Sequence, residues 1–261
     1  MNINKSKLKY KIDIIILNWK RPDNLIKKII PHLLKSDFIN KIYISHGRID
    51  TFFKSKWKRV ICLKHFKENE SYGLFLRYYT AVKYAKTKFI FFQDDDILVP
   101  DETFYQLIKY QLQKKNAIHG IFGRYIDSET LYNIQKVYSE VPIVLTRILI
   151  CNKKLMNIVL KEKSKIDLYV KKKSKPYWNG EDIFLNIISM HYNQNINYAY
   201  PLKYADIKDK ENLGISDQKS HLKYRVELCK KLLKMYKIPN YKKIKIKLLY
   251  KFYTLYYTKF N

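Results

Sequence analysis

Three consecutive aspartates, Asp94, Asp95 and Asp96, end a run of bulky apolar residues in the stretch FFQDDDILVPDE at positions 91–102. Adjacent carboxylates repel one another unless a positive charge sits between them. Burial would raise their pKa values, whereas a divalent cation would keep them ionised. Carboxylate oxygens suit Mg²⁺ or Mn²⁺, which proteins hold with one or two carboxylates and the phosphates of a substrate. The cluster therefore predicts a site for a metal ion and a diphosphate.

A second interpretation is that the acids form a solvated loop that caps the following helix. Acidic side chains stabilise the first turn of a helix because they offset the helix dipole. Asp101 and Glu102, at the start of the next predicted helix, are enough for that purpose. We therefore favour the metal site.

The aspartates lie where an α/β sheet is expected to bind its ligand. The run IDIIIL at 12–17 is short, apolar and β-branched, which is typical of a strand buried on both faces. Ligands of open α/β sheets bind beyond the carboxyl ends of the strands, and strict alternation would place Asp94 and Asp96 on one side with Asp95 opposite. The first part of the chain is predicted to have strands at 12–17, 41–45, 59–63 and 88–93, with helices at 22–34 and 73–86.

The rest of the chain continues the α/β pattern less regularly. Pro31 is expected to kink the first helix or end it early. Ser216 is a plausible N-cap for the last predicted helix. Predicted strands lie at 118–125, 141–152 and 196–201, and predicted helices at 100–113, 152–162, 181–192 and 216–236. The expected fold is α/β, with a mixed, mostly parallel sheet flanked by helices.

Composition limits the class of protein. The 261 residues are 47% hydrophobic, enough for one substantial core, and 52 Lys and Arg against 23 Asp and Glu give a net charge of +29. Such a surface attracts nucleic acid, anionic lipid, or phosphorylated and sulfated substrates. The first residues, MNINKSKLKYK, do not resemble a signal peptide, and no apolar run is long enough for a transmembrane segment. We expect a cytoplasmic protein, and three widely spaced cysteines, Cys62, Cys151 and Cys229, predict neither a disulfide framework nor a zinc site.

Four stretches of the chain resemble one known family. The aspartates after an apolar strand are similar to the D-x-D motif of nucleotide-sugar glycosyltransferases with the GT-A fold. The stretch IIILNWKRPDNLIKKIIPHLLKS resembles the first strand and helix of the exostosin C-terminal domain, WNGEDIFLNIIS its acidic helix start, and LGISDQKSHLKYRVELC its C-terminal basic helix. The similarity runs in order over roughly residues 10–235, which is more specific than a lone D-x-D.

The resemblance implies a single GT-A-type domain over 1–239 that uses Mn²⁺ or Mg²⁺ to move a sugar from a UDP-sugar to a glycan or other hydroxyl acceptor. The sugar would be an N-acetylhexosamine or a hexose, transferred with retention of configuration. The half spanning 10–100 would bind the nucleotide-sugar, and the half spanning 101–239 would bind the acceptor.

The same resemblance implies roles for single residues. Asp96 would be the direct metal ligand, and Asp94 would lie near the ribose or the metal shell, with Asp95 in the same cofactor-binding cluster. Asp182, with its neighbour Glu181, would lie at the reactive face of the sugar. Arg21 would contact the nucleotide, and Arg77 would contact the sugar or the diphosphate. Arg225 and His221 would contact the departing diphosphate. Two alternatives stay open: Arg21 simply precedes a helix, and Arg77 is one of many surface cations. For His221 a surface position is favoured.

One position departs from the family pattern. The family usually has a cysteine immediately before its acidic pair, bridged to the C-terminal helix. Here that position is Gly180, although Cys229 lies near the expected partner position. We therefore expect no such bridge, in agreement with the expected cytoplasmic location.

Two basic segments allow two interpretations each. The lysine-rich stretch 163–175 is either a mobile lid or acceptor-binding loop, or a solvated loop. Beyond Glu227 the chain has ten lysines and no acidic residue. Its last part, 240–261, either lies peripherally on an anionic membrane or packs on the domain.

Two rival functions share some of these features. A metal-dependent nuclease or phosphotransferase would also need clustered acids and a basic surface. Such an enzyme should draw its acids from several strands, however, and only one strand-end cluster is visible. A non-catalytic nucleic-acid-binding protein would explain the charge but not the aspartates, so we do not expect specific nucleic-acid binding.

Overall fold

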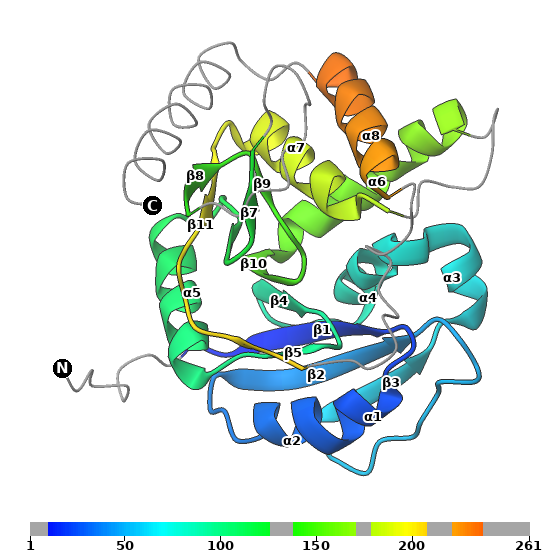
Figure 1. Cartoon of the computed structure of the whole chain (residues 1–261), viewed down its shortest axis with the longest axis vertical. Coiled ribbons are helices and arrows are strands. Elements are labelled where there is room, and N and C mark those ends of the chain that lie inside the picture. The colour runs from blue at the N-terminus through cyan, green and yellow to red at the C-terminus, as the bar shows by residue number, and fades with distance from the viewer. Residues whose placement is uncertain (1–9, 126–137, 171–178, 208–220, 237–261) are drawn as a thin grey trace.

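An eight-stranded mixed sheet, in the order β3-β2-β1-β4-β10-β6-β11-β8, runs through the computed structural model (Figure 1). The structure describes residues 10–125, 138–170, 179–207 and 221–236. The predicted tail at 240–261, the cap Ser216 and the lysines at 171–175 lie outside these ranges.

The first half of the sheet is parallel, as predicted. Strand β1 (Ile12–Asn18) pairs with β2 (Ile39–His46) on one side and with β4 (Phe89–Gln93) on the other, and β2 pairs with β3 (Val60–Lys64). Both faces of β1, β2 and β4 are largely buried, which explains their apolar sequences, whereas β3 at the edge of the sheet is half-buried. Their carboxyl ends therefore meet at one edge, directly beside the aspartates.

The helical segments of this half differ from the prediction at two places. Of the two alternatives expected at Pro31, an early end is wrong, because α1 (Pro22–Asn24), a π-helical turn η2 (Leu25–Ile29) and α2 (Ile30–Leu33) follow one another without a break. The helix is instead distorted at the π-helical turn. The wider turn comes before the proline, which cannot donate a backbone hydrogen bond. A helix that was not predicted, α3 (Phe66–Tyr72), precedes the turn η3 (Gly73–Phe75) and the predicted helix α4 (Leu76–Tyr84).

The second half of the sheet is built from shorter strands. Strand β10 (Ile148–Asn152) runs antiparallel to β4 and continues to β6 (His119–Gly120), β11 (Asn197–Ala199) and β8 (Ser139–Val141). Two small pairs join β7 (Gly123–Arg124) to β9 (Ile143–Val144) and β5 (Ile97–Leu98) to β12 (Ala205–Asp206). The long strands predicted at 118–125 and 141–152 are thus divided. The second is divided at Pro142, between β8 and β9, and again between Val144 and Ile148.

The remaining helices are α5 (Asp101–Gln113), α6 (Lys153–Val170), α7 (Glu181–Asn193) and α8 (His221–Met235). Helix α6 extends through residues 163–170, so the predicted loop or lid is wrong for that part of the lysine-rich stretch. None of the helices in the described ranges is long and apolar enough to span a membrane.

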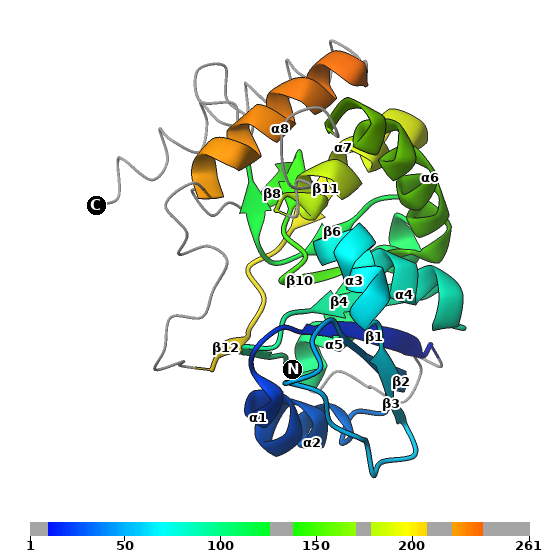
Figure 2. The same ribbon diagram turned by 90° about the vertical axis from the view of Figure 1, so that its right-hand side faces the viewer.

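Helices cover the sheet on both faces, giving three layers. One core packs the α1–α2 segment and α5 against β1, β2, β4 and β10, and the other packs α4, α6, α7 and α8 against the opposite face. Figure 2 shows α7 and α8 at the end of the molecule opposite α1 and α2. The predicted fold class, a mixed α/β sheet flanked by helices, is confirmed.

Candidate functional site

The aspartates lie at the carboxyl edge of the sheet, immediately after β4. The strand ends at Gln93 and the chain turns, so strict strand alternation does not continue through the triplet. The side chain of Asp95 is only 5% exposed, whereas those of Asp94 and Asp96 are 34% and 24% exposed. Asp94 and Asp96 are therefore the two carboxylates that a ligand can reach.

Asp95 is fixed to the end of β1. Its carboxylate accepts hydrogen bonds from the backbone N–H of Trp19, at 3.2 Å, and from Nη1 of Arg21, at 3.0 Å. Burial, followed by repulsion from Asp94, raises the pKa of Asp95 to about 6, although Arg21 opposes this shift. Asp95 thus links the carboxyl ends of β1 and β4 and fixes the positions of Asp94 and Asp96.

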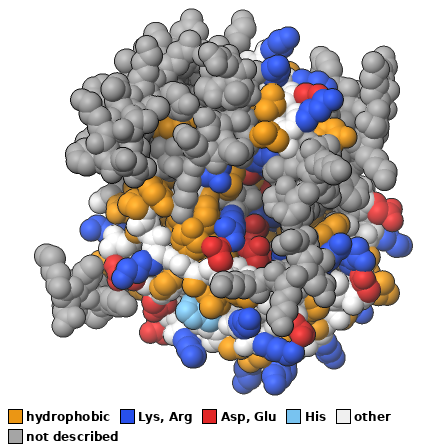
Figure 3. All heavy atoms as spheres, viewed as in Figure 1, with side chains coloured by type: hydrophobic (Ala, Val, Ile, Leu, Met, Phe, Trp, Pro, Cys, Tyr) orange, Lys and Arg blue, Asp and Glu red, His pale blue; other side chains and the backbone are white. Residues whose placement is uncertain are grey.

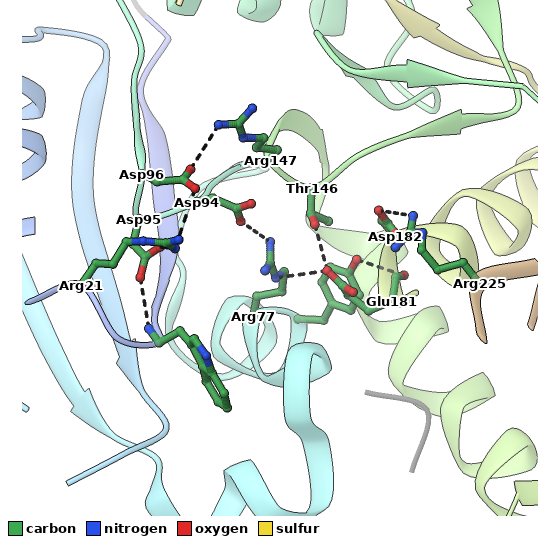
Figure 4. Close-up of polar contacts among 12 residues, drawn as sticks. Arg21, Arg77, Asp94, Asp95, Asp96, Thr146, Arg147, Glu181, Asp182 and Arg225 are labelled. Atoms are coloured by element: carbon green, nitrogen blue, oxygen red, sulfur yellow. Dashed lines mark hydrogen bonds and ion pairs between the residues drawn. The ribbon is translucent and has the colours of Figure 1, made fainter. Parts of the chain in front are cut away.

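Asp94 and Asp96 contact different arginines, as Figure 4 shows. Nη1 of Arg77 donates to Asp94 at 3.2 Å, and Nη2 of Arg147 lies 3.5 Å from Asp96. Arg21 is also 3.7 Å from Asp96. Burial and the neighbouring charge of Asp94 raise the pKa of Asp96. The carboxylates are thus partly compensated, and a further cation would favour their ionised state.

Arg77, on α4, connects the aspartates to a second acidic pair at the start of α7. Its Nε lies 3.6 Å from the carboxylate of Glu181, which also accepts a hydrogen bond from Oγ1 of Thr146 at 2.9 Å. The side chains of Arg77 and Glu181 are almost fully buried. Burial raises the pKa of Glu181 in spite of the attraction of Arg77. Glu181 therefore holds Arg77 in place from the side opposite Asp94.

Asp182 forms the far end of this network. Nη2 of Arg225, on α8, donates to its carboxylate at 2.9 Å, and Nη1 of the same arginine donates to Asn179 at 3.2 Å. The N-terminus of α7 is reached through Gly180, which has a φ of +118°. A Cβ at this position would lie 2.6 Å from Cδ2 of Leu228 on α8, and the positive φ itself favours glycine. Cys62, Cys151 and Cys229 form no disulfide with one another.

The fold thus brings together nearly all the residues that the sequence indicated. Figure 3 shows acidic and basic side chains side by side in a hollow at the centre of one face. His221 begins α8, but its side chain lies outside the described part of the structure. Thr146 and Arg147, between β9 and β10, and Asp206 on β12, which pairs with Arg147, were not predicted from the sequence.

The chemistry of these donors fits a divalent cation. Asp94 and Asp96 are partly exposed, offer hard oxygen ligands and repel each other, a cost that a cation would remove. The described residues contain no group of three His, Cys, Asp or Glu side chains arranged to hold a metal. Protein ligands would therefore be few, and waters and phosphate oxygens would complete the coordination, as is usual for Mg²⁺-type sites.

Comparisons with known proteins identify a family and a similar fold. A family model described as "Glycosyl transferase family 64 domain" matches residues 12–252. Among curated proteins, none matches the chain significantly. The crystal structure of GalNAc-T7 with UDP, GalNAc and Mn²⁺ has a similar fold, with a TM-score of 0.54 and 10% identity. That match covers 86% of this chain and 48% of the other, so this chain spans about half the length of the solved relative.

Proposed function

This chain belongs to glycosyl transferase family 64, and on that basis we propose that it transfers a sugar from a UDP-sugar to a hydroxyl group of a glycan or other acceptor. The transfer would be metal-dependent, and the sugar an N-acetylhexosamine or a hexose, as in exostosin-like enzymes. The single observation that carries this proposal is the succession of charge pairs from the sheet edge to the start of α7: Asp96 with Arg147, Asp94 with Arg77 and Glu181, and Asp182 with Arg225. The related fold of GalNAc-T7, solved with UDP, GalNAc and Mn²⁺, supports a UDP-sugar and Mn²⁺ here.

In this proposal the nucleotide lies across the carboxyl ends of β1 and β4. Asp96 would hold the metal, with Asp94 beside it and Arg21 near the nucleotide. A bound Mn²⁺ or Mg²⁺ would act as a Lewis acid that stabilises negative charge on the departing diphosphate. Asp95, which is buried and already bonded to Trp19 and Arg21, would position the cluster rather than bind the ligand.

The sugar would lie between the aspartates and the start of α7. Cleavage of the bond between C1 and the diphosphate oxygen leaves positive charge at C1 and negative charge on the phosphates. Asp182 would stabilise the positive charge and hold the acceptor hydroxyl, while Arg225 and Arg77 would donate charge-assisted hydrogen bonds to the phosphates. We propose retention of configuration; if the reaction inverted, Asp182 would accept the hydroxyl proton.

Glu181 takes a different role from the one implied by the resemblance. Its carboxylate is buried and already contacts Arg77 and Thr146. Asp182 is similarly buried, but its partner is Arg225, which is itself proposed to bind the departing diphosphate. We therefore propose that Glu181 positions Arg77 and that Asp182 takes part in the reaction. The family match also favours this function over a nuclease, a phosphotransferase or a basic nucleic-acid-binding protein.

The test is the release of UDP from a panel of UDP-sugars, with acceptor glycans, in the presence of Mn²⁺ or of a chelator. We expect release from at least one UDP-sugar that requires metal and leaves nuclease substrates intact. Metal-dependent cleavage of DNA or RNA without any UDP release would overturn the proposal.

A further inference from the structure

Arg147 is the arginine of the site that the structure holds least firmly. Its side chain is 29% exposed, whereas those of Arg21, Arg77 and Arg225 are 12%, 7% and 5% exposed. Arg77 and Arg225 are fixed by buried carboxylates on α7, and Arg21 is fixed by Asp95. Release of Arg147 would therefore disturb the fewest buried groups.

The contacts of Arg147 leave part of its guanidinium unused. Nη2 alone reaches both of its carboxylates, Asp96 at 3.5 Å and Asp206 at a shorter distance. Within the described part of the chain, Nη1 and Nε form no hydrogen bond or ion pair. The planar group lies 5.0 Å from the centroid of the Phe122 ring, which supports it from one side. A planar fork with spare N–H groups is well suited to bind phosphate oxygens.

The position of Arg147 relative to the aspartates is set by the backbone. The N–H of Asp94 donates to the carbonyl of Arg147 at 3.2 Å, and the preceding Thr146 bonds to Glu181. Figure 4 shows the side chain of Arg147 directed at Asp96 and that of Thr146 directed at Glu181. Arg147 thus lies against the same carboxylate that the proposed function assigns to the metal.

We propose that Arg147 is the internal counter-cation of Asp96: it neutralises this carboxylate in the free protein, gives it up to an incoming divalent cation, and then donates its unused N–H groups to a phosphate of the nucleotide. This inference rests on the proposed function, because it requires a metal and a diphosphate at Asp96. Asp206, 53% exposed on β12, is the second carboxylate that receives Arg147 when Asp96 is occupied.

The first test compares two affinities in Arg147→Gln. Mn²⁺ binding without nucleotide, followed by the electron paramagnetic resonance signal of the free ion, should become roughly three- to tenfold tighter, because a competing cation is removed. UDP binding at saturating Mn²⁺, measured by calorimetry, should become weaker by roughly tenfold or more, because a charge-assisted hydrogen bond is lost. A purely structural role would weaken both affinities. Arg147→Lys, which keeps the charge but not the fork, should leave the Mn²⁺ affinity near wild type and weaken UDP binding less.

The second test uses the exposed partner of Arg147 and does not depend on the stability of Arg147→Gln. Asp206→Asn should weaken Mn²⁺ binding, because Arg147 then rests on Asp96 alone. Loss of the negative charge of Asp206 weakens Mn²⁺ binding directly in both backgrounds. The effect through Arg147 exists only when Arg147 is present, so the weakening should be larger in the wild-type background than in Arg147→Gln. An equal effect in both backgrounds, or affinities that fall together in Arg147→Gln, would overturn this inference while leaving the proposed function intact. Absence of Mn²⁺ and UDP binding by the wild-type protein would overturn both.

Discussion

Asp96 lies at the end of the charge network where the metal is proposed to bind, and removal of its charge should abolish metal-dependent nucleotide binding. In Asp96→Asn we expect UDP binding at saturating Mn²⁺ to fall to the level measured with a chelator, and turnover to fall by roughly 10²-fold or more. Calorimetry and UDP release measure the two effects. The matched control is Asp23→Asn, which alters an exposed aspartate paired with Lys27. Wild-type turnover in Asp96→Asn would contradict the assignment.

Asp182 lies at the other end of the site, and its substitution should reduce turnover much more than binding. Asp182→Asn keeps a side-chain oxygen that accepts from Arg225 but removes the charge that would stabilise C1. We expect UDP and Mn²⁺ to bind within a fewfold of wild type, while turnover falls by roughly 10²- to 10⁴-fold. Equal losses of binding and turnover would place Asp182 in nucleotide binding instead. Thermal unfolding checks that both variants are folded.

The sequence reveals some of these residues much better than others. The aspartates and the Glu181–Asp182 pair stand out because several acids follow one another in a chain with 52 Lys and Arg. Arg147 and Asp206 carry no such signal: each is one charged residue beside a short strand, and they meet only because β12 pairs with β5. Such a contact depends on tertiary pairing, which a local pattern does not encode.

The junction between α7 and α8 depends on one glycine. Gly180 has a φ of +118° and lies against Leu228, so Gly180→Ala introduces both backbone strain and a steric clash. We expect a loss of roughly 2 kcal/mol or more in the free energy of unfolding, measured by urea denaturation. Leu228→Ala should cost less stability in the Gly180→Ala background than in the wild type, because it then also removes the clash. No loss in Gly180→Ala would show that the helix start is less constrained than the structure indicates.

His119, on β6, makes the stability of the sheet depend on pH. Tyr200 donates its hydroxyl to Nδ1, at 2.9 Å, and the carbonyl of Lys114 lies 3.1 Å from Nε2, so the neutral ring satisfies both contacts. Burial lowers the pKa of His119 from 6.5 to about 4. Between these values the unfolded chain binds the proton and the folded protein does not, so stability is lost as pH falls from about 6.5 to about 4.

The expected size of this effect is up to about 3 kcal/mol. The difference in unfolding free energy between wild type and His119→Gln should therefore shrink or reverse as the pH falls from 7 to 4.5. Comparison with the variant cancels contributions from other groups, including His46, whose pKa burial also lowers to about 4. A difference that does not change with pH would refute this assignment.

Element prediction succeeded where a strand or helix is long and buried. The parallel strands β1, β2 and β4 were recognised from continuous apolar runs, which follow from burial of both faces. Helix α3 was missed because the sequence FKENESY has no apolar stripe and contributes no fully buried residue. The end of α6 was misjudged because residues 163–170 run directly into the lysines at 171–173, which suggested a loop although lysine is a good helix former.

At the scale of the whole molecule, a net charge of +29 contrasts with a site in which acidic side chains slightly outnumber arginines. The excess positive charge therefore lies elsewhere, and the sequence concentrates much of it after Glu227. For the segment 240–261, which lies outside the described residues, packing on the domain stays the favoured interpretation, and contact with anionic membranes is the alternative that makes a testable prediction. Removal of 240–261 should reduce co-sedimentation with phosphatidylserine vesicles, and added salt should weaken binding of the full chain. Equal partitioning of both forms would exclude a membrane role for this segment.

The central claim is that clustered carboxylates at the edge of the sheet hold a metal, which in turn holds a nucleotide diphosphate. The most direct measurement is a crystal structure of the protein soaked with Mn²⁺ and UDP, with anomalous scattering used to locate manganese. We predict one manganese peak bonded to a carboxylate oxygen of Asp96 and to oxygens of both phosphates, with Arg147 moved from Asp96 toward the nucleotide. Manganese and UDP bound elsewhere, or no density beside Asp94 and Asp96 at saturating concentrations, would contradict the claim.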